Sequence, residues 1–242
     1  MSVASSFRTS SGCRIIRDAT ESDHDILSVG AHTIGGMATL IPQQGNQSAN
    51  ETASAKVRKD MTREANLRFD CSWVAHPDLV PLCKEVFDGV LGDRPNQIEV
   101  FGQHSLPTHK ELLEFSIPNA NTTVEGLKNN VVVALRYIAT RLSGNGAVAI
   151  FGLMEDAATA EIARSQIWQW IHNGTKLDDG SIVTRQRVQK LIDEEAAVLT
   201  KENHSSITTK HIETAKEIVE TVTLGVEFVE FLTTIAYEKL IL

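Results

Sequence analysis

Apolar residues follow two different patterns along the chain, and the change lies near residue 121. Before it, residues 31 to 42 (AHTIGGMATLIP) and 71 to 77 (CSWVAHP) are short apolar runs, which predict two short buried strands. The first strand precedes a polar helix that Asn50 can cap and that ends near Arg68. The second precedes a helix whose first turn accepts Pro77. The order strand, helix, strand, helix predicts an α/β unit.

From residue 122 onward the apolar residues recur at spacings of three and four, which predicts helices. Expected N-caps of three helices are Thr122, in a capping box with Glu125, then Asp156 and Thr184. The same spacing continues through the last segment, about residues 207 to 240, and GNGAVAI at 144 to 150 predicts a helix stop followed by a short strand. Gly, Pro and Asn accumulate between residues 92 and 121, which indicates a boundary between the two halves.

Composition narrows the class of protein. The 242 residues include 31 acidic and 23 basic side chains, a formal net charge of −8 with no basic patch, which argues against nucleic-acid binding. No apolar run approaches the ~20 residues of a membrane-spanning helix, so no membrane association is expected. Three cysteines without a pairing pattern favour a reducing compartment. Residues 1 to 17 carry arginines and serines but no acid, a weak resemblance to a mitochondrial transit peptide.

The segment GLMEDAATAEIARSQIWQW, residues 152 to 170, places two carboxylates before a helix. Asp156 has a simple structural explanation as an N-cap, yet a carboxylate fixed at a helix end is also preorganised to accept a proton. Glu155 is expected to be solvated. Trp73 lies at the end of a predicted strand, ahead of a helix, so it either packs in the core or lines a pocket.

Four blocks, in this order, carry a resemblance to a known family: HTIGGMATLIP, SWVAHPDLVPLCKEVFD, LRYIATRLSGNGAVAI and LMEDAATAEIARSQIWQWIHNG. They closely resemble the second half of the A-type malate synthases, over about residues 30 to 240. The resemblance implies an α/β plus all-α chain. An incomplete TIM-barrel segment with the last strands and helices would occupy residues 31–95, and a C-terminal helical cap domain residues 122–242. Residues 96–121 would be a linker and residues 1–30 a divergent, irregular segment.

The family makes malate from glyoxylate and acetyl-CoA, so the resemblance implies a Claisen-type condensation followed by hydrolysis, in the glyoxylate cycle. Asp156 would be the general base that removes a methyl proton from acetyl-CoA. Trp73 and Met37 would lie beside the glyoxylate and pantetheine pocket. The family also uses Mg²⁺ to polarise glyoxylate and an arginine to stabilise the enolate.

This chain departs from the family at several points. The family's metal ligands and arginine lie in earlier barrel strands with no counterpart after Met1, so Mg²⁺ is expected to have no ligand in this chain. The chain is then a fragment, a truncated gene model or a relative that has lost the metal half of the site. The family's asparagine pair before LMEDAA is replaced by Phe151 and Gly152. The last three residues are not a peroxisomal tripeptide, although the family is peroxisomal (glyoxysomal) or cytoplasmic.

Two alternatives to an active malate synthase are open at this stage. The chain could be a non-catalytic relative that binds acyl-CoA or a partner, with possible self-association through exposed barrel edges. It could also be another acyl-CoA lyase on a related barrel, against which the LMEDAATAE block argues.

Overall fold

The structure is a computed structural model that describes residues 30–42, 45–100, 108, 110, 113, 121–202 and 206–240. The chain divides into two compact units, which are described separately below. The strand–helix unit spans Ser11–Pro118 and Phe151–Met154, and the helical unit includes Asn119–Ile150 and Glu155–Leu242. Phe151–Met154 therefore groups with the strand–helix unit, although the sequence placed it in the helical cap. Most of the expected segment 1–30 and of the expected linker 96–121 lies outside the described residues.

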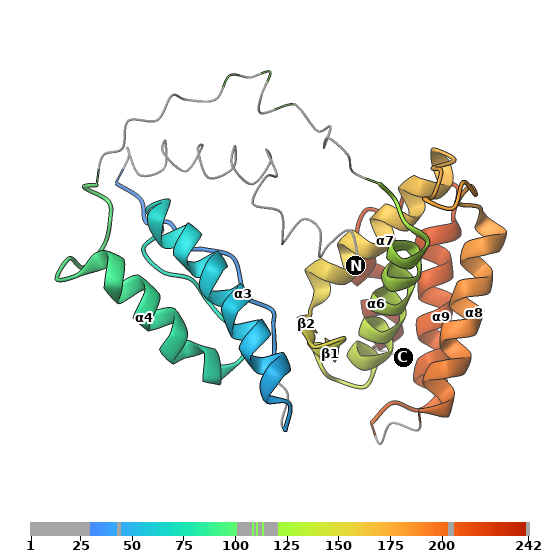
Figure 1. The fold of residues 1–242 in the computed structure, drawn as a ribbon. Coiled ribbons are helices and arrows are strands. Elements are labelled where there is room, and N and C mark those ends of the chain that lie inside the picture. Colours follow the sequence, from blue (N-terminus) through green and yellow to red (C-terminus); the bar gives the residue numbers. More distant parts are fainter. Residues whose placement is uncertain are drawn as a thin grey trace. The chain divides into compact units, whose positions relative to one another are not determined.

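Two helices form the body of the strand–helix unit. Helix α3 (Gln47–Asn66) and helix α4 (Val80–Leu91) pack side by side (Figure 1), and the short 3₁₀ turn η1 (Pro77–Leu79) leads into α4. The buried side chains of this unit form one core, made of Val57, Met61, Ala65, Phe69, Leu79 and Phe87. The N-cap of α3 is Asn46, whose side chain accepts a hydrogen bond from Ala49 N at 3.1 Å, so the prediction of Asn50 as the cap was wrong. Asn46 supplies the same chemistry one turn earlier.

The two predicted strands are shorter than expected. Residues 31 to 42 and 71 to 77 pair in parallel only through isolated bridges, Ile34 with Cys71 and Ala38 with Val74. Leu40 also forms an antiparallel bridge with Leu153. Parallel pairing is slightly less stable per residue, and the consecutive glycines Gly35 and Gly36 weaken a strand interior. The parallel pairing is consistent with adjacent strands of a partial barrel.

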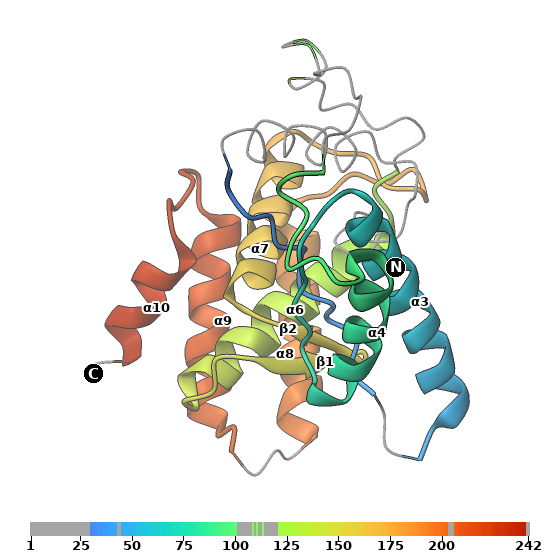
Figure 2. The same ribbon diagram turned by 90° about the vertical axis from the view of Figure 1, so that its left-hand side faces the viewer.

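Helices α6 (Val124–Leu142), α7 (Ala157–His172), α8 (Arg185–Lys201) and α9 (Thr209–Leu224) build the helical unit. Helix α6 packs against the other three, and α10 (Leu232–Leu240) lies against α9 (Figure 2). The predicted apolar stripes form the shared core, which includes Leu127, Val131, Ile138, Ala163, Ile167, Val188, Ile192, Ala215 and Val219. The helical C-terminal half that the spacing predicted is therefore present.

The caps of these helices test the sequence predictions individually. Asp156 caps α7 and Thr184 caps α8, as predicted. The cap of α6 is Thr123 and not Thr122, and its hydroxyl accepts a hydrogen bond from Gly126 N at 2.9 Å. Neighbouring threonines offer the same hydroxyl, so spacing alone does not distinguish them.

The helical segment expected over about residues 207 to 240 is divided into two helices, because α9 ends at Leu224 and α10 begins at Leu232. The intervening segment is held from α7 by Arg164, whose side chain is fully buried. Its Nη1 donates to Val229 O at 2.6 Å and its Nη2 to Glu230 O at 3.1 Å, while the guanidinium lies 4.3 Å from the centroid of Phe228. Backbone carbonyls that would bond within a continuous helix are thus satisfied by Arg164.

Strands β1 (Val148–Ile150) and β2 (Leu153–Glu155) confirm the short strand predicted after GNG and form a two-stranded sheet. The two residues between them, Phe151 and Gly152, have positive φ angles of 51° and 76°. Two positive φ angles are typical of a tight type I′ hairpin turn. Among the described helices, none is long and apolar enough to cross a membrane.

Candidate active site

Asp156 is held at the N-terminus of α7 by a capping box. Its Oδ1 accepts hydrogen bonds from the backbone N–H and the hydroxyl of Thr159, each at 3.1 Å, and the Thr159 hydroxyl lies 3.5 Å from the Asp156 backbone N–H. Thr159 is buried and Asp156 is half-buried. No hydrogen bond from a described residue reaches Oδ2. One oxygen therefore fixes the carboxylate, and the other is available to accept a proton.

The charge of Asp156 influences the pKa of Tyr137 in α6. The Tyr137 side chain is buried, and burial is the main reason that its pKa is raised above the ordinary value. The positive charge of Arg141 lowers that pKa, and the negative charge of Asp156 raises it. The phenol therefore stays neutral near pH 7 and adds no second negative charge beside Asp156.

Glu155 differs from its prediction. The residue is only 4% exposed, so the expectation of a solvated side chain was wrong. It is the last residue of β2, where the alternation of strand side chains turns it inward while the next residue begins a helix cap. Of the two adjacent carboxylates, Asp156 is the more accessible.

Met37 and Trp73 are brought together in the strand–helix unit. Ala38 N donates to Trp73 O at 2.9 Å, and Ala75 N donates to Ala38 O at 2.9 Å, so the two segments run side by side. Trp73 is 54% exposed and Ile34 is 62% exposed, whereas Thr33 is only 6% exposed. The paired segments thus have one open face, and Trp73 lies on it. The interpretation of Trp73 as a core residue was wrong, and its assignment to a pocket stays a prediction.

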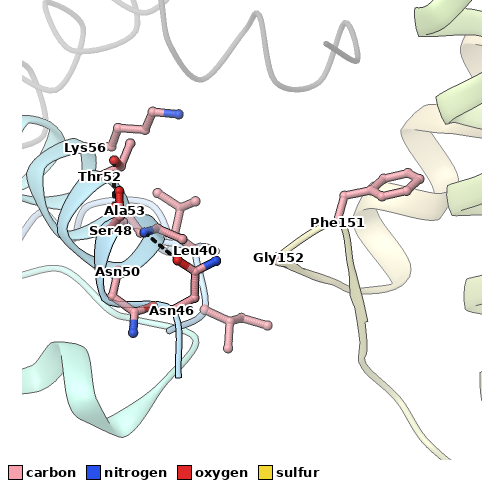
Figure 3. Close-up of a pocket in the computed structure, with 11 residues that line it drawn as sticks. Leu40, Asn46, Ser48, Asn50, Thr52, Ala53, Lys56, Phe151 and Gly152 are labelled. Carbon is pink, nitrogen blue, oxygen red and sulfur yellow. Dashed lines mark hydrogen bonds between the residues drawn. The ribbon is translucent and has the colours of Figure 1, made fainter. Parts of the chain in front are cut away.

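The strand–helix unit also holds a cavity of about 400 Å³ that the sequence did not indicate. Polar side chains at the beginning of α3 line one side, and Phe151 and Gly152 line the other (Figure 3). The α3 side includes Asn46, Ser48, Asn50, Thr52 and Lys56. None of the predicted site residues Asp156, Trp73 and Met37 lines this cavity. A row of polar residues in the first turns of a helix looks like an ordinary solvated surface, so no spacing could have indicated it.

Phe151–Met154 joins the first strand segment by backbone hydrogen bonds. Ile41 N donates to Gly152 O at 3.0 Å, and Met154 N donates to Thr39 O at 2.7 Å. Met154 precedes Asp156 by two positions in the sequence. The chain that leads to the predicted base is therefore fixed by regular hydrogen bonding up to Met154.

The described residues do not offer a magnesium site. Among them, no three His, Cys, Asp or Glu side chains gather in a group that could hold a metal ion. His32 Nδ1 and Asp70 Oδ2 lie 2.6 Å apart, but two ligating side chains are fewer than the three that such a group needs. The other oxygen of Asp70, Oδ1, already accepts a hydrogen bond from Gln97 N at 2.6 Å. Magnesium is bound through carboxylates in near-ideal octahedral geometry. The donor set present in this part of the chain does not fit Mg²⁺, and no reaction step is assigned through it.

Comparisons with known proteins cover nearly the whole chain. Residues 21–115 match the family model of the malate synthase TIM barrel domain, and residues 121–240 match that of the malate synthase C-terminal domain. A malate synthase of Streptomyces clavuligerus is 47% identical over 87% of this chain, and malate synthase A of Escherichia coli (strain K12) is 38% identical over 87%. A glyoxysomal malate synthase of Zea mays is 44% identical over 69%. The chain spans 39% of the length of the first two relatives and 31% of the third.

Proposed function

The chain belongs to the malate synthase family, and from this premise we propose that it provides the general base for the condensation of acetyl-CoA with glyoxylate in the glyoxylate cycle. The observation that carries the proposal is the state of Asp156, whose Oδ1 is fixed by Thr159 while Oδ2 receives no hydrogen bond from a described residue. A general base must be both oriented and accessible. The TIM-barrel and C-terminal family matches support the same assignment.

In the proposed reaction, Oδ2 of Asp156 removes a proton from the methyl group of acetyl-CoA. The electron pair of the broken C–H bond forms the enolate, whose carbon attacks the aldehyde carbon of glyoxylate and makes the new C–C bond. The aldehyde oxygen takes up a proton to give malyl-CoA. Water then cleaves the thioester, which releases malate and CoA. The acidity of a thioester methyl group is low, so orientation of the base within hydrogen-bond reach is its main contribution.

Met37 and Trp73 are proposed as substrate-binding residues. Trp73 presents a half-exposed indole on the open face of the paired segments, and Met37 is half-buried beside it. An aromatic ring and a flexible thioether suit the apolar part of the pantetheine arm. Magnesium would polarise glyoxylate when bound, but the described residues do not hold it.

A second candidate function is a non-catalytic member of the family that binds acyl-CoA or a partner chain. The observation that favours it is the pair of exposed apolar side chains, Ile34 and Trp73, on the paired segments. Such a protein would bind acetyl-CoA without converting it.

One experiment separates the two candidates. The purified 242-residue chain is mixed with acetyl-CoA, glyoxylate and Mg²⁺, and release of the free CoA thiol is followed, with glyoxylate and Mg²⁺ each omitted in turn. Release that depends on glyoxylate supports the catalytic proposal. No release from a folded chain that binds acetyl-CoA by calorimetry supports the non-catalytic candidate and contradicts the first.

A further inference from the structure

A carboxylate of α3 lies directly beneath the glycine pair that precedes Met37. Glu64 Oε2 is buried and has no hydrogen-bond partner among the described residues. A Cβ atom added to Gly35 would overlap this oxygen and would lie 2.6 Å from Glu64 Cδ and 2.9 Å from Ser72 Oγ. Gly35 does not have a positive φ angle, so the need for glycine here comes from the space that the carboxylate occupies.

The same carboxylate contacts both segments of the open face. The neighbouring Ser72 side chain and Gly36 backbone each lower the pKa of Glu64 and so favour its ionised form. Ser72 Oγ also donates to Gly36 O at 2.9 Å, and Gly35 N donates to Cys71 O at 2.8 Å. Glu64 therefore connects α3 to both Gly36, which directly precedes Met37, and Ser72, which directly precedes Trp73.

This arrangement is costly for stability alone. Burying a carboxylate with an unsatisfied oxygen disfavours folding, and an apolar side chain would fill the same space at lower cost. Burial is the largest influence on Glu64 and raises its pKa above the ordinary value. The presence of Glu64 at this position is therefore better explained by the backbone geometry that it imposes at Gly35–Gly36 and at Ser72 than by a gain in stability.

We propose that Glu64 is a positioning residue, which sets the backbone at Gly35–Gly36 and at Ser72 so that Met37 and Trp73 keep the orientation required for substrate. The substrate-binding roles of Met37 and Trp73 rest on the proposed function. Glu64 acts in this proposal through its neighbours, since its Oε2 is buried beneath Gly35. The positioning effect acts through the close packing of the carboxylate against Gly35, beside Ser72.

The test uses the full chain labelled with ¹³C at methionine methyl groups and ¹⁵N at tryptophan indoles. Glu64→Ala should move the Met37 methyl and Trp73 indole resonances and leave the Trp168 indole resonance of the helical unit in place. Glu64→Gln keeps the shape and one acceptor oxygen, so it should return both resonances most of the way to the wild-type positions. Unmoved Met37 and Trp73 resonances in Glu64→Ala would overturn the proposal.

Two further variants keep the test decisive if Glu64→Ala does not fold. Ser72→Ala removes one partner of the carboxylate with little change in volume, and it should also move the Met37 and Trp73 resonances; unchanged resonances would overturn the proposal. Glu85→Gln is the matched control, since Glu85 is an exposed glutamate of the same unit that pairs with Arg58 at 2.9 Å. It should move neither resonance.

An activity measurement distinguishes this proposal from the proposed function. In Glu64→Ala, the KM for acetyl-CoA or glyoxylate should rise several-fold more than kcat falls, because binding geometry is disturbed and the base is intact, and Glu64→Gln should return the KM most of the way to the wild-type value. A wild-type chain that releases no CoA would contradict the proposed function, while the resonances would still decide whether Glu64 positions Met37 and Trp73.

Discussion

Thr159 donates both its backbone N–H and its hydroxyl to the same oxygen of Asp156, Oδ1, at 3.1 Å each. The cap and the proposed base are therefore two functions of one carboxylate, divided between its two oxygens. The capping role explains why the sequence pattern alone favoured a structural interpretation. It also gives the proposed base a fixed orientation before substrate arrives.

Asp156→Asn should separate these two functions. Asparagine is about as good an N-cap as aspartate, so the free energy of unfolding should change by less than roughly 1 kcal/mol. Activity should fall by roughly 10²-fold or more, because an amide cannot take the methyl proton. Thermal unfolding and CoA release in the same preparation measure both quantities.

Thr184→Ala is the matched control for that experiment, since Thr184 caps α8 through the same kind of hydrogen bond, to Arg187 N at 3.2 Å. It should cost roughly 1 kcal/mol of stability and leave CoA release unchanged. If Asp156→Asn behaved like this control, with a loss of stability and unchanged CoA release, Asp156 would be only a cap.

Trp73→Ala should affect binding more than stability. The indole is 54% exposed, so its removal takes little surface out of the core, and the free energy of unfolding should fall by about 0.5 kcal/mol or less. The dissociation constant for acetyl-CoA, measured by calorimetry, should rise. Ile34→Ala removes another exposed apolar side chain of the paired segments and should leave affinity closer to wild type. A large loss of stability with unchanged affinity would show that Trp73 serves packing.

Periodicity predicted the elements whose apolar face is continuous, such as α6, where Leu127, Val131 and Ile138 are all buried. It failed where a tertiary contact decides the backbone. Val226 continues the apolar spacing of α9, yet it is 72% exposed beyond Gly225, because Arg164 binds the carbonyls of the segment that follows. A buried arginine on another helix gives no periodic signal. The observed N-caps of α3 and α6 differ from the predicted ones by one turn and by one residue, since nearby residues offer equivalent side-chain acceptors.

The candidate site could be predicted only in part. The LMEDAATAE block identified Asp156, and the structure adds which oxygen is fixed. The Glu64 contact could not be predicted, because α3 is a polar helix in which a glutamate is ordinary, and only the fold places that carboxylate against Gly35. The close approach of Glu64 to Gly35 depends on α3 and on the segments that contain Gly35 and Ser72. The spacing of apolar residues predicts the structure of one segment at a time.

Phe151→Asn should stabilise the chain. Phe151 has a φ angle of 51° in the turn between β1 and β2, a conformation that asparagine adopts more readily than an aromatic residue. Its side chain is 74% exposed, so little packing is lost. The free energy of unfolding should rise by roughly 1 kcal/mol, measured by denaturant titration. Phe231→Asn, at another exposed phenylalanine without a positive φ angle, is the control and should give no gain. Equal effects at both positions would contradict backbone strain at Phe151.

Glu64 should also make stability depend on pH in a defined direction. Burial is the largest influence on the pKa of Glu64 and raises it, and the negative charge of Asp60 raises it further. The Ser72 side chain, the positive charge of Arg63 and the Gly36 backbone each lower it. The folded state therefore binds the proton more tightly than the unfolded state, in which glutamate titrates near ~4.3. The contribution of protonated Glu64 to the free energy of unfolding is present in full below that pH. It is lost as the pH rises through the higher pKa of the folded state.

The free energy of unfolding of wild type relative to Glu64→Gln should accordingly decrease as the pH is raised from about 4 to about 8, as measured by denaturant titration. Burial also raises the pKa of the neighbouring Asp60, but Asp60 is present in both proteins, so most of its contribution cancels in the difference. Glu85→Gln should behave in the opposite way. The hydrogen bond from Arg58 lowers the pKa of Glu85, so any stability that this exposed pair provides is lost as the pH falls. A wild-type advantage over Glu64→Gln that grows with pH would mean that folding lowers the pKa of Glu64, contrary to the dominant effect of its burial beneath Gly35.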